Sequence, residues 1–167
     1  MVCTPGSNTP IPSPPELTIS ALTSDAPFEE MRTFCATPQD GFNPGSPVQV
    51  SDAEVTKTLA DLKDCRALLA KWICVPVAGG LVTPPYEGTS ELAGVATLQA
   101  RRGRGIGAAL VSRAAEEAFA NGVNVLFLSN VTEEASRLYE RAGFWFLARM
   151  LFMIDAAPAQ SAGKVTP

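Results

Sequence analysis

The feature that most constrains the fold is a glycine-rich and arginine-rich turn between a buried strand and a helix. Residues 101–107 (RRGRGIG), called the glycine turn below, directly precede an alanine-rich helical pattern. Residues 91–98 (ELAGVATL) before it are apolar on both faces, which is typical of a central strand. Residues 123–129 (VNVLFLS) follow the helix and read as the next buried strand. This order of strand, turn, helix and strand predicts an α/β fold.

The glycine turn has three interpretations: a phosphate-binding turn, a nucleic-acid arm, or a loop with a helix cap. N–H groups at a helix N-terminus converge on one point, and the helix dipole adds partial positive charge there. Glycines let phosphate oxygens approach the backbone, and arginines suit a ligand with several phosphates. The plain alternative is that Gly103 and Gly105 only make the turn. A formal net charge of −4 argues against nucleic acid as the main partner.

The glycine turn can be compared with two nucleotide-binding patterns, the dinucleotide pattern and the Walker A loop. Gly103, Gly105 and Ala108 match the dinucleotide pattern G-x-G-x-x-G/A. A dinucleotide fold places an acidic residue after the next strand, whereas here that strand leads to Asn130. A Walker A loop is excluded because the sequence has no Gly-Lys-Ser/Thr. Both patterns are therefore disfavoured.

The rest of the chain predicts helices on both faces of one sheet, in the order β-α-α-β-β-β-α-β-α-β. Ser51 and Glu54 have the spacing of a capping box and predict a helix start. Gly79-Gly80 reads as a hairpin turn after an apolar run, and Gly122 as the end of the central helix. The other expected elements are a strand over 17–24, a helix over 26–36, a loop over 37–50, a helix over 132–142 and a strand over 144–154.

The chain ends and the apolar runs set the domain organisation. We expect a flexible Pro-rich arm over residues 1–15, one domain over 16–155 and a flexible tail over 156–167. The N-terminus lacks the pattern of a secretory signal, and the longest apolar run, 144–154, is too short to cross a membrane. Four widely spaced cysteines and no histidine make a zinc site improbable. These features indicate a cytoplasmic protein with no metal and no membrane partner.

Two motifs in the second half of the chain resemble those of the GNAT superfamily of N-acetyltransferases. Residues 102–107 (RGRGIG) match R-x-x-G-x-G/A, and residues 135–144 (ASRLYERAGF) are similar to the L-Y-x-x-x-G-F signature. The resemblance covers roughly residues 91–147. It implies a mixed, mostly antiparallel central sheet with helices on both faces. Gln99 stands where many members have proline, and Thr132 where many have asparagine.

The resemblance also implies acetyl-CoA as co-substrate and a set of residues that bind it. Backbone groups of Thr97 and Leu98 would pair with the pantetheine, and amides of the glycine turn would hold the pyrophosphate. Side chains of Arg102 and Arg104 would add charge-assisted bonds to phosphates. The full cofactor-binding set is Thr97, Leu98, Arg102, Gly103, Arg104, Gly105, Ile106, Gly107, Ala108 and Asn130.

Acetyl transfer to an amine needs a base, because an alkyl ammonium with a pKa of about 10.4 is protonated at neutral pH. With no histidine in the chain, a carboxylate is the natural candidate. Glu91 opens the central strand on the family's substrate side, where alternation predicts that it shares a face with Val95 and Thr97. Glu87 is the rival. The tyrosine of the second motif, Tyr139, would donate a proton to the departing sulfur.

The acceptor is expected to be a primary amine of a small molecule or a protein. A catalytically silent acyl-CoA-binding module is the alternative, and an acetyltransferase acting on charged tRNA is disfavoured by the acidic balance. In this fold, variable loops such as 37–50 and 82–90 bind the acceptor, so the sequence does not identify it. The apolar run 144–154 is a candidate edge for pairing with a second copy in a homodimer.

Overall fold

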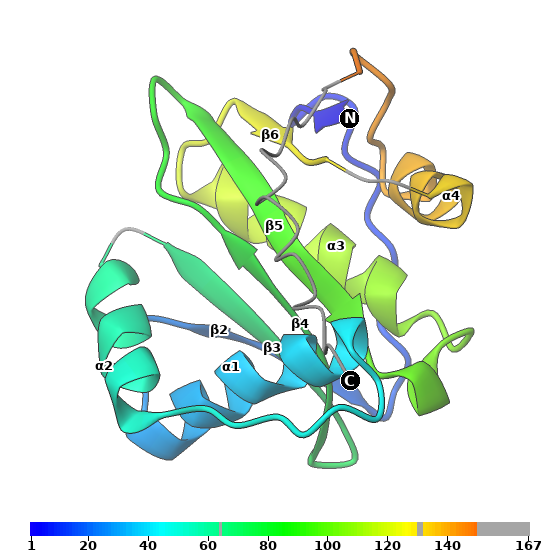
Figure 1. The fold of residues 1–167 in the computed structure, drawn as a ribbon. Coiled ribbons are helices and arrows are strands. Elements are labelled where there is room, and N and C mark those ends of the chain that lie inside the picture. The colour runs from blue at the N-terminus through cyan, green and yellow to red at the C-terminus, as the bar shows by residue number, and fades with distance from the viewer. Residues whose placement is uncertain (64, 130–131, 150–167) are drawn as a thin grey trace, which may run out of the picture.

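The computed structural model describes residues 1–63, 65–129 and 132–149, which build one six-stranded sheet with helices on both faces (Figure 1). The strand order is β1-β6-β5-β4-β3-β2. The strands are β1 (Val2–Cys3), β2 (Leu17–Leu22), β3 (Arg66–Trp72), β4 (Val75–Val82), β5 (Thr89–Thr97) and β6 (Val125–Phe127). The helices are α1 (Phe28–Phe42), α2 (Asp52–Asp61), α3 (Ile106–Ala120) and α4 (Glu133–Arg141), with a 3-10 turn over Gln99–Arg101.

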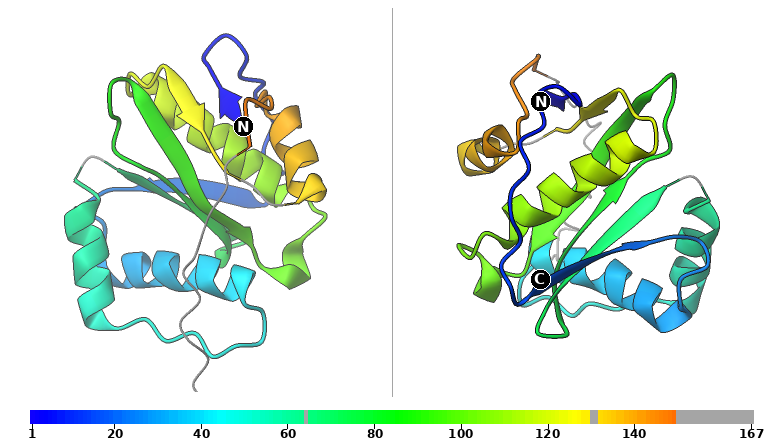
Figure 2. Two further views of the ribbon diagram at one scale, coloured as in Figure 1. Left: turned by 45° about the horizontal axis from the view of Figure 1, so that its top comes forward. Right: turned by 180° about the vertical axis from the view of Figure 1, so that it is seen from behind.

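The expected sheet is confirmed as mixed and mostly antiparallel. Only β5 and β6 pair in parallel among the described strands, and every other neighbouring pair is antiparallel. Helices α1 and α2 cover one face, and α3 covers the other with α4 beside it (Figures 1 and 2). Each face has its own apolar core. One core lies between the sheet and helices α1 and α2, and it includes Met31, Phe34 and Val55. The other lies between the sheet and α3, and it includes Leu110 and Val111.

Helix α1 runs further than the sequence predicts. The expected end was residue 36, but the helix continues through Pro38 to Phe42. Packing accounts for the extension, because Pro38 and Gly41 press directly onto the sheet. A Cβ built on Gly79 would lie 2.9 Å from Pro38 Cγ, and one built on Gly41 would lie 2.9 Å from Ala96 Cβ. Tertiary contacts thus outweigh the low helix propensity of proline.

The first hairpin turns at a different place from the one expected. Ile73 and Cys74 make the β3–β4 turn, with φ of 46° and 65°. Gly79 and Gly80, expected as the turn, are buried in the middle of β4. Their missing side chains make room for Pro38 on one side and Val95 on the other. The glycines therefore serve close packing, so the prediction of a turn there is wrong.

Strand β5 contains a bulge that reverses the expected alternation. Leu81 pairs with Ala93 and Gly79 with Ala96, so two residues of β5, Gly94 and Val95, lie opposite one residue of β4. Gly94 has a φ of +61°, which glycine adopts readily. Beyond the bulge, Val95 packs in the same core as Leu92.

The bulge places Glu91 on another face than expected. Glu91 alternates with Leu92, which packs under α3, so Glu91 faces the α1 side of the sheet. Val95 packs on the α3 side, and Thr97 Oγ1 lies near Gly107 of α3. The prediction that Glu91 shares a face with Val95 and Thr97 is therefore wrong.

The N-terminal residues, expected as a flexible arm, are placed differently. Strand β1 pairs with β6, and both of its residues are buried. The Ile11 amide donates a hydrogen bond of 2.8 Å to Oγ of Ser112. Ser112 is itself buried in α3. Burial of a few apolar residues and pairing with the edge of β6 thus hold this segment in place despite its polar composition.

The expected last strand is not formed over its described part. Trp145 makes one antiparallel bridge to Val2, and residues 146–149 are exposed and outside any strand. Strand β1 occupies the edge of the sheet beside β6, and the pairing of run 144–154 with a second copy stays a prediction. Residues 150–154 and the predicted tail over 156–167 lie outside the described residues.

Candidate functional site

Strands β5 and β6 pair only briefly and then separate. Their register joins Thr89, Ser90 and Glu91 to residues 125–127, and Figure 1 shows the strands diverging after that. The bulge at Gly94 bends β5, while the Leu128 amide donates to the Met1 carbonyl at 2.9 Å and holds the end of β6 toward β1. Beyond Glu91, β5 pairs only with β4 within the described residues. We call its unpaired side over residues 92–97 the open edge of β5.

Hydrogen bonds show which backbone groups face the open edge. The Leu98 amide donates to Val77 of β4 at 2.8 Å, and the Leu98 carbonyl accepts from the Arg101 amide at 2.9 Å. Both backbone groups of Leu98 are therefore used inside the protein. Leu98 has no free backbone group for the expected contact with the pantetheine. Because successive residues of a strand point their backbone groups to opposite sides, Thr97 and Val95 face the open edge. Val95 was not expected, because it lies outside both motifs.

The glycine turn leads directly into α3. Gly103 and Gly105 have φ of 74° and 78°, and no atom lies within 4 Å of a Cβ built on either. The helix begins at Ile106, as expected, and its first turn carries no acidic residue. The three other α-helices formed by the described residues each have two acidic residues in the first turn. The N-terminus of α3 therefore keeps open space and uncompensated N–H donors, which suits an anionic ligand.

Gly107 and Ala108, the next residues of α3, have a different role from the two glycines before them. A Cβ built on Gly107 would lie 3.1 Å from Leu138 Cδ1 of α4 and 3.4 Å from Thr97 Oγ1. Ala108 is buried. The missing side chain of Gly107 and the small side chain of Ala108 thus allow α3 to pack closely, while the amides of both residues remain in the first turn of the helix.

The arginines of the glycine turn contact the protein itself. Arg102 donates from Nε to the Thr97 carbonyl at 3.1 Å and from Nη2 to the Gly41 carbonyl at 2.8 Å. The Arg104 guanidinium carbon lies 5.9 Å from the centre of the Trp72 ring, a cation–π distance. Both residues were expected at the phosphates, and these contacts are what the structure shows.

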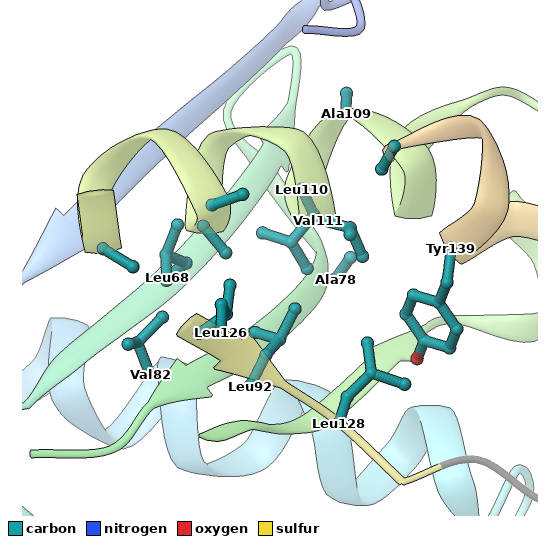
Figure 3. Packing of buried hydrophobic residues seen from close by; sticks show 14 of the residues in the cluster. Leu68, Ala78, Val82, Leu92, Ala109, Leu110, Val111, Leu126, Leu128 and Tyr139 are labelled. Carbon is teal, nitrogen blue, oxygen red and sulfur yellow. The ribbon is translucent and has the colours of Figure 1, made fainter. Parts of the chain in front are cut away.

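Tyr139 lies in the last turn of α4 and is buried. Its ring packs at 6.0 Å and 60° against Phe144, which is also buried. Figure 3 shows the hydroxyl pointing toward Leu128, just beyond the end of β6. Burial raises the pKa of the Tyr139 hydroxyl, so the group holds its proton at neutral pH. A protonated hydroxyl in this place can act as a proton donor.

The two candidate carboxylates are separated by the hairpin geometry. Glu91 is half-buried. It pairs with Phe127, and this is the last residue pair before β5 and β6 separate. Its amide donates to Thr83 Oγ1 at 2.8 Å and its carbonyl accepts from the Thr83 amide at 2.9 Å, which fixes the backbone. Glu87 is exposed at the β4–β5 turn with a φ of 49°. It lies toward the closed end of the hairpin, away from the open edge of β5.

Asn130 lies outside the described residues, so its expected contact with the cofactor stays a prediction. Nearby, Thr132 caps α4, because its hydroxyl accepts a hydrogen bond of 3.2 Å from the Ala135 amide. This cap orients the helix that carries Tyr139.

One cavity lies apart from the predicted site. It has a volume of about 560 Å³ and opens between α1 and the segment before α2. Arg32 on its wall donates to the Val50 carbonyl and pairs with Asp52, so its guanidinium is already engaged. Within the part of the chain that the structure describes, no three His, Cys, Asp or Glu side chains group as a metal site. No helix among those residues is long and apolar enough to span a membrane.

Comparisons with known proteins agree with this geometry. The model of the Acetyltransferase (GNAT) family matches residues 31–144. A GCN5-related N-acetyltransferase from Kribbella flavida is 29% identical with a TM-score of 0.64, covering 85% of this chain but only 51% of that protein. This chain thus spans about half the length of the Kribbella protein.

Two further solved structures share the fold at low identity. An aminoglycoside acetyltransferase from an uncultured soil metagenomic sample, in complex with sisomicin, is 13% identical with a TM-score of 0.70, covering 85% of this chain and 97% of that one. Glucosamine-6-phosphate N-acetyltransferase from Arabidopsis thaliana is 14% identical with a TM-score of 0.66, covering 84% and 99%. No protein of curated function matches the chain.

Proposed function

Because the chain belongs to the Acetyltransferase (GNAT) family, we propose that it transfers an acetyl group from acetyl-CoA to a primary amine. The observation that carries this proposal is the open edge of β5, which leads to the uncompensated N-terminus of α3. Unpaired strand backbone suits an extended chain of amides, and a helix N-terminus suits phosphates. Acetyl-CoA carries both groups in one molecule and supplies the acetyl group as a thioester.

The residues that would hold acetyl-CoA follow from the directions of their backbone groups. The backbone groups of Val95 and the amide of Thr97 would bind the pantetheine along the open edge of β5, because the Thr97 carbonyl already accepts from Arg102. Amides of residues 103–108 would bind the pyrophosphate, because Gly103 and Gly105 leave space in front of them. Asn130 and the side chain of Arg104 remain proposed contacts of the outer phosphates, whereas the Arg102 guanidinium donates to the Thr97 and Gly41 carbonyls.

Glu91 is the proposed base. It lies where β5 and β6 part, on the face covered by α1 and α2, and a strand holds its backbone. A carboxylate in this position would take a proton from the ammonium of the acceptor, directly or through water. The amine would then attack the thioester carbon with its lone pair.

Tyr139 is the proposed acid. Its hydroxyl points toward the end of β6 from the α4 side, and burial raises its pKa (Figure 3). A hydroxyl that keeps its proton can donate it to the sulfur as the carbon–sulfur bond breaks. Glu91 and Tyr139 would thus serve opposite ends of the same transfer.

Small-molecule amines are the proposed acceptor class. The two low-identity neighbours are named for an aminoglycoside and for glucosamine-6-phosphate, which are both small amines. The net charge of −4 favours cationic acceptors over acidic ones. A protein amine is the second acceptor to test.

The experiment is a screen with free-thiol detection over aminoglycosides, polyamines, amino sugars, amino acids and peptides. We expect acetyl-CoA to raise the melting temperature and at least one amine to release CoA thiol. Ligand at a hundred times its Kd adds about 2.7 kcal/mol to the free energy of unfolding. Stabilisation without thiol release over the whole panel would instead favour the silent acyl-CoA-binding module. Absence of stabilisation would refute the proposed function.

Gly105→Val tests the glycine turn, and Gly122→Val is its matched control. Both glycines have positive φ, 78° and 85°, and open space around the missing Cβ. Both variants therefore carry a similar backbone cost, at opposite ends of α3. Only Gly105→Val puts a side chain where the pyrophosphate would lie, so only this variant should lose acetyl-CoA binding in calorimetry. Equal binding by the two variants would remove the glycine turn from the site.

A further inference from the structure

Arg102 joins two elements that are distant in the sequence. Its Nη2 donates to the Gly41 carbonyl at 2.8 Å across a separation of 61 residues, and its Nε donates to the Thr97 carbonyl at 3.1 Å. Gly41 belongs to the last turn of α1 and Thr97 ends β5. One guanidinium therefore connects α1, β5 and the first residues of the glycine turn.

The contact with Gly41 satisfies a need of α1. The last carbonyls of a helix lack partners within the helix and carry partial negative charge. The last turn of α1 contains no basic residue, so its own sequence supplies no cation there. Gly41 is also pressed against Ala96 of β5, since an added Cβ would lie 2.9 Å from Ala96 Cβ. Arg102 thus supplies a positive charge to the C-terminal carbonyls of α1, at the point where Gly41 packs against Ala96 of β5.

The contact with Thr97 lies on the other side of the same junction. Thr97 is the last residue of the open edge of β5, and its backbone faces away from β4. The guanidinium that caps α1 therefore also occupies a carbonyl beside the proposed pantetheine path. Because this side chain holds both α1 and β5, a shift of either element would move the other.

We infer that Arg102 is a positioning residue that couples the C-terminal turn of α1, on the acceptor face, to the acetyl-CoA site. This inference rests on the proposed function and deepens it. Acetyl-CoA bound along β5 and the glycine turn fixes Thr97 and Arg102, and Arg102 then fixes residues 39–43 at the end of α1. The first ligand would in this way order one wall of the acceptor site before the amine arrives.

The test compares Arg102→Met with Arg101→Met by hydrogen exchange of residues 37–43. Arg101 is adjacent and equally charged, and its side chain makes no hydrogen bond or ion pair within the described part of the chain. Without ligand, we expect exchange at the end of α1 to become at least tenfold faster in Arg102→Met and to stay unchanged in Arg101→Met. Equal exchange in both variants would overturn the anchoring of α1.

The coupling has its own readout, with acetyl-CoA as the probe. In the unmodified protein, acetyl-CoA should slow exchange of residues 37–43, and in Arg102→Met this protection should vanish even at acetyl-CoA concentrations that calorimetry shows to saturate the variant. A merely structural contact would not make the protection depend on ligand. No protection in the unmodified protein despite binding would overturn the coupling.

Arg102→Lys separates this inference from a phosphate role. Lysine keeps the charge but cannot reach two carbonyls as a planar fork does. If Arg102 positions α1, Arg102→Lys should behave as Arg102→Met does. A tenfold loss of acetyl-CoA affinity in Arg102→Met that Arg102→Lys restores, with α1 exchange unchanged, would make Arg102 a phosphate ligand instead. If the unmodified protein binds no acetyl-CoA, the proposed function fails, whereas the exchange without ligand still tests the anchor.

Discussion

At the scale of single residues, burial decides what Tyr139 can do. An exposed tyrosine loses its proton near pH 10, and burial raises the pKa of Tyr139 above that of an exposed side chain. The neutral hydroxyl is the form that donates a proton, and raising the pKa extends this form to higher pH. The proposed acid would therefore keep its proton over the whole pH range in which alkyl amines begin to lose theirs.

We expect Tyr139→Phe to lower kcat by roughly ten- to a thousandfold and to leave the Kd of acetyl-CoA unchanged. The removed hydroxyl is proposed to act on the departing sulfur and to add little to binding. In the unmodified protein, kcat should show no loss from this group below about pH 10. Stopped-flow thiol detection between pH 6 and pH 11 measures both effects. An unchanged kcat, with chemistry shown to limit the rate, would leave Tyr139 with packing alone.

Glu91→Gln and Glu87→Gln form a matched pair for the base. Each removes one carboxylate and keeps the shape of the side chain, but only Glu91 lies at the parting of β5 and β6. Glu91→Gln should lower kcat/KM at neutral pH and recover part of it at high pH, where the amine deprotonates unaided. Glu87→Gln should keep the original pH profile. The reverse result would exchange the two roles, and no change in either would leave proton removal to water.

At the scale of elements, the bulge in β5 creates the site. Two residues of β5 opposite one residue of β4 bend the strand away from β6 and turn the backbone of Val95 and Thr97 outward. The bulge depends on Gly94, whose φ of +61° is costly for any other residue. The open edge of β5 is thus set by one glycine in the middle of a strand.

Gly94→Val should lower both stability and acetyl-CoA affinity. A left-handed backbone costs a branched residue about 1–2 kcal/mol, and removing the bulge to avoid this cost would displace the open edge of β5. Gly45→Val is the control, because Gly45 also has positive φ and open space but lies in the loop after α1. Urea unfolding should show a similar loss in both variants, whereas calorimetry should show weaker acetyl-CoA binding only in Gly94→Val. Full affinity in Gly94→Val would mean that the bulge does not shape the site.

Local signals were predictable from the sequence, and signals that depend on distant contacts were not. The Ser51 hydroxyl accepts from the Glu54 amide at 3.2 Å, as the capping box predicts, because both residues lie in one helical turn. The start of α3 follows from the glycine turn in the same way. Gly79-Gly80 predicts a turn, because the same glycine pair can either bend the chain or make room for a neighbouring residue. Here it makes room for Pro38 of α1. The Gly41 partner of Arg102 lies far along the chain and has no local pattern.

At the scale of the whole molecule, the N-terminal residues connect the elements that carry the site. Val2 exchanges backbone hydrogen bonds with Trp145 at 3.0 and 2.9 Å, and the Thr9 amide donates to the Ala142 carbonyl at 3.2 Å. Cys3 is fully buried in the core beneath α3. Figure 2 shows this segment passing beside α4 and across α3 before it reaches β2. The segment therefore supports α4, the helix that carries Tyr139.

Gly143→Ala tests this support. A Cβ on Gly143 would lie 2.0 Å from the Ser7 carbonyl oxygen, so residues 4–9 must move, and the φ of +92° adds backbone strain. We expect a loss of about 3 kcal/mol in the free energy of unfolding, from overpacking and strain together. Gly122→Ala carries the backbone strain alone and should lose about 1 kcal/mol. Urea denaturation compares the two, and equal losses would show that the N-terminal segment yields without cost.

The pairing of β1 with β6 also fixes an order of events in folding. The Met1 amino group donates to the Leu128 carbonyl across a separation of 127 residues, one of the longest-range contacts this chain could make. Closing a loop of that length costs about 4 kcal/mol of chain entropy if the intervening chain is still unfolded. The cost is much smaller once β2 to β6 are assembled, because the ends are then already near each other. Residues 1–3 are thus expected to be among the last to dock, and the support for α4 arrives only when the rest of the sheet exists.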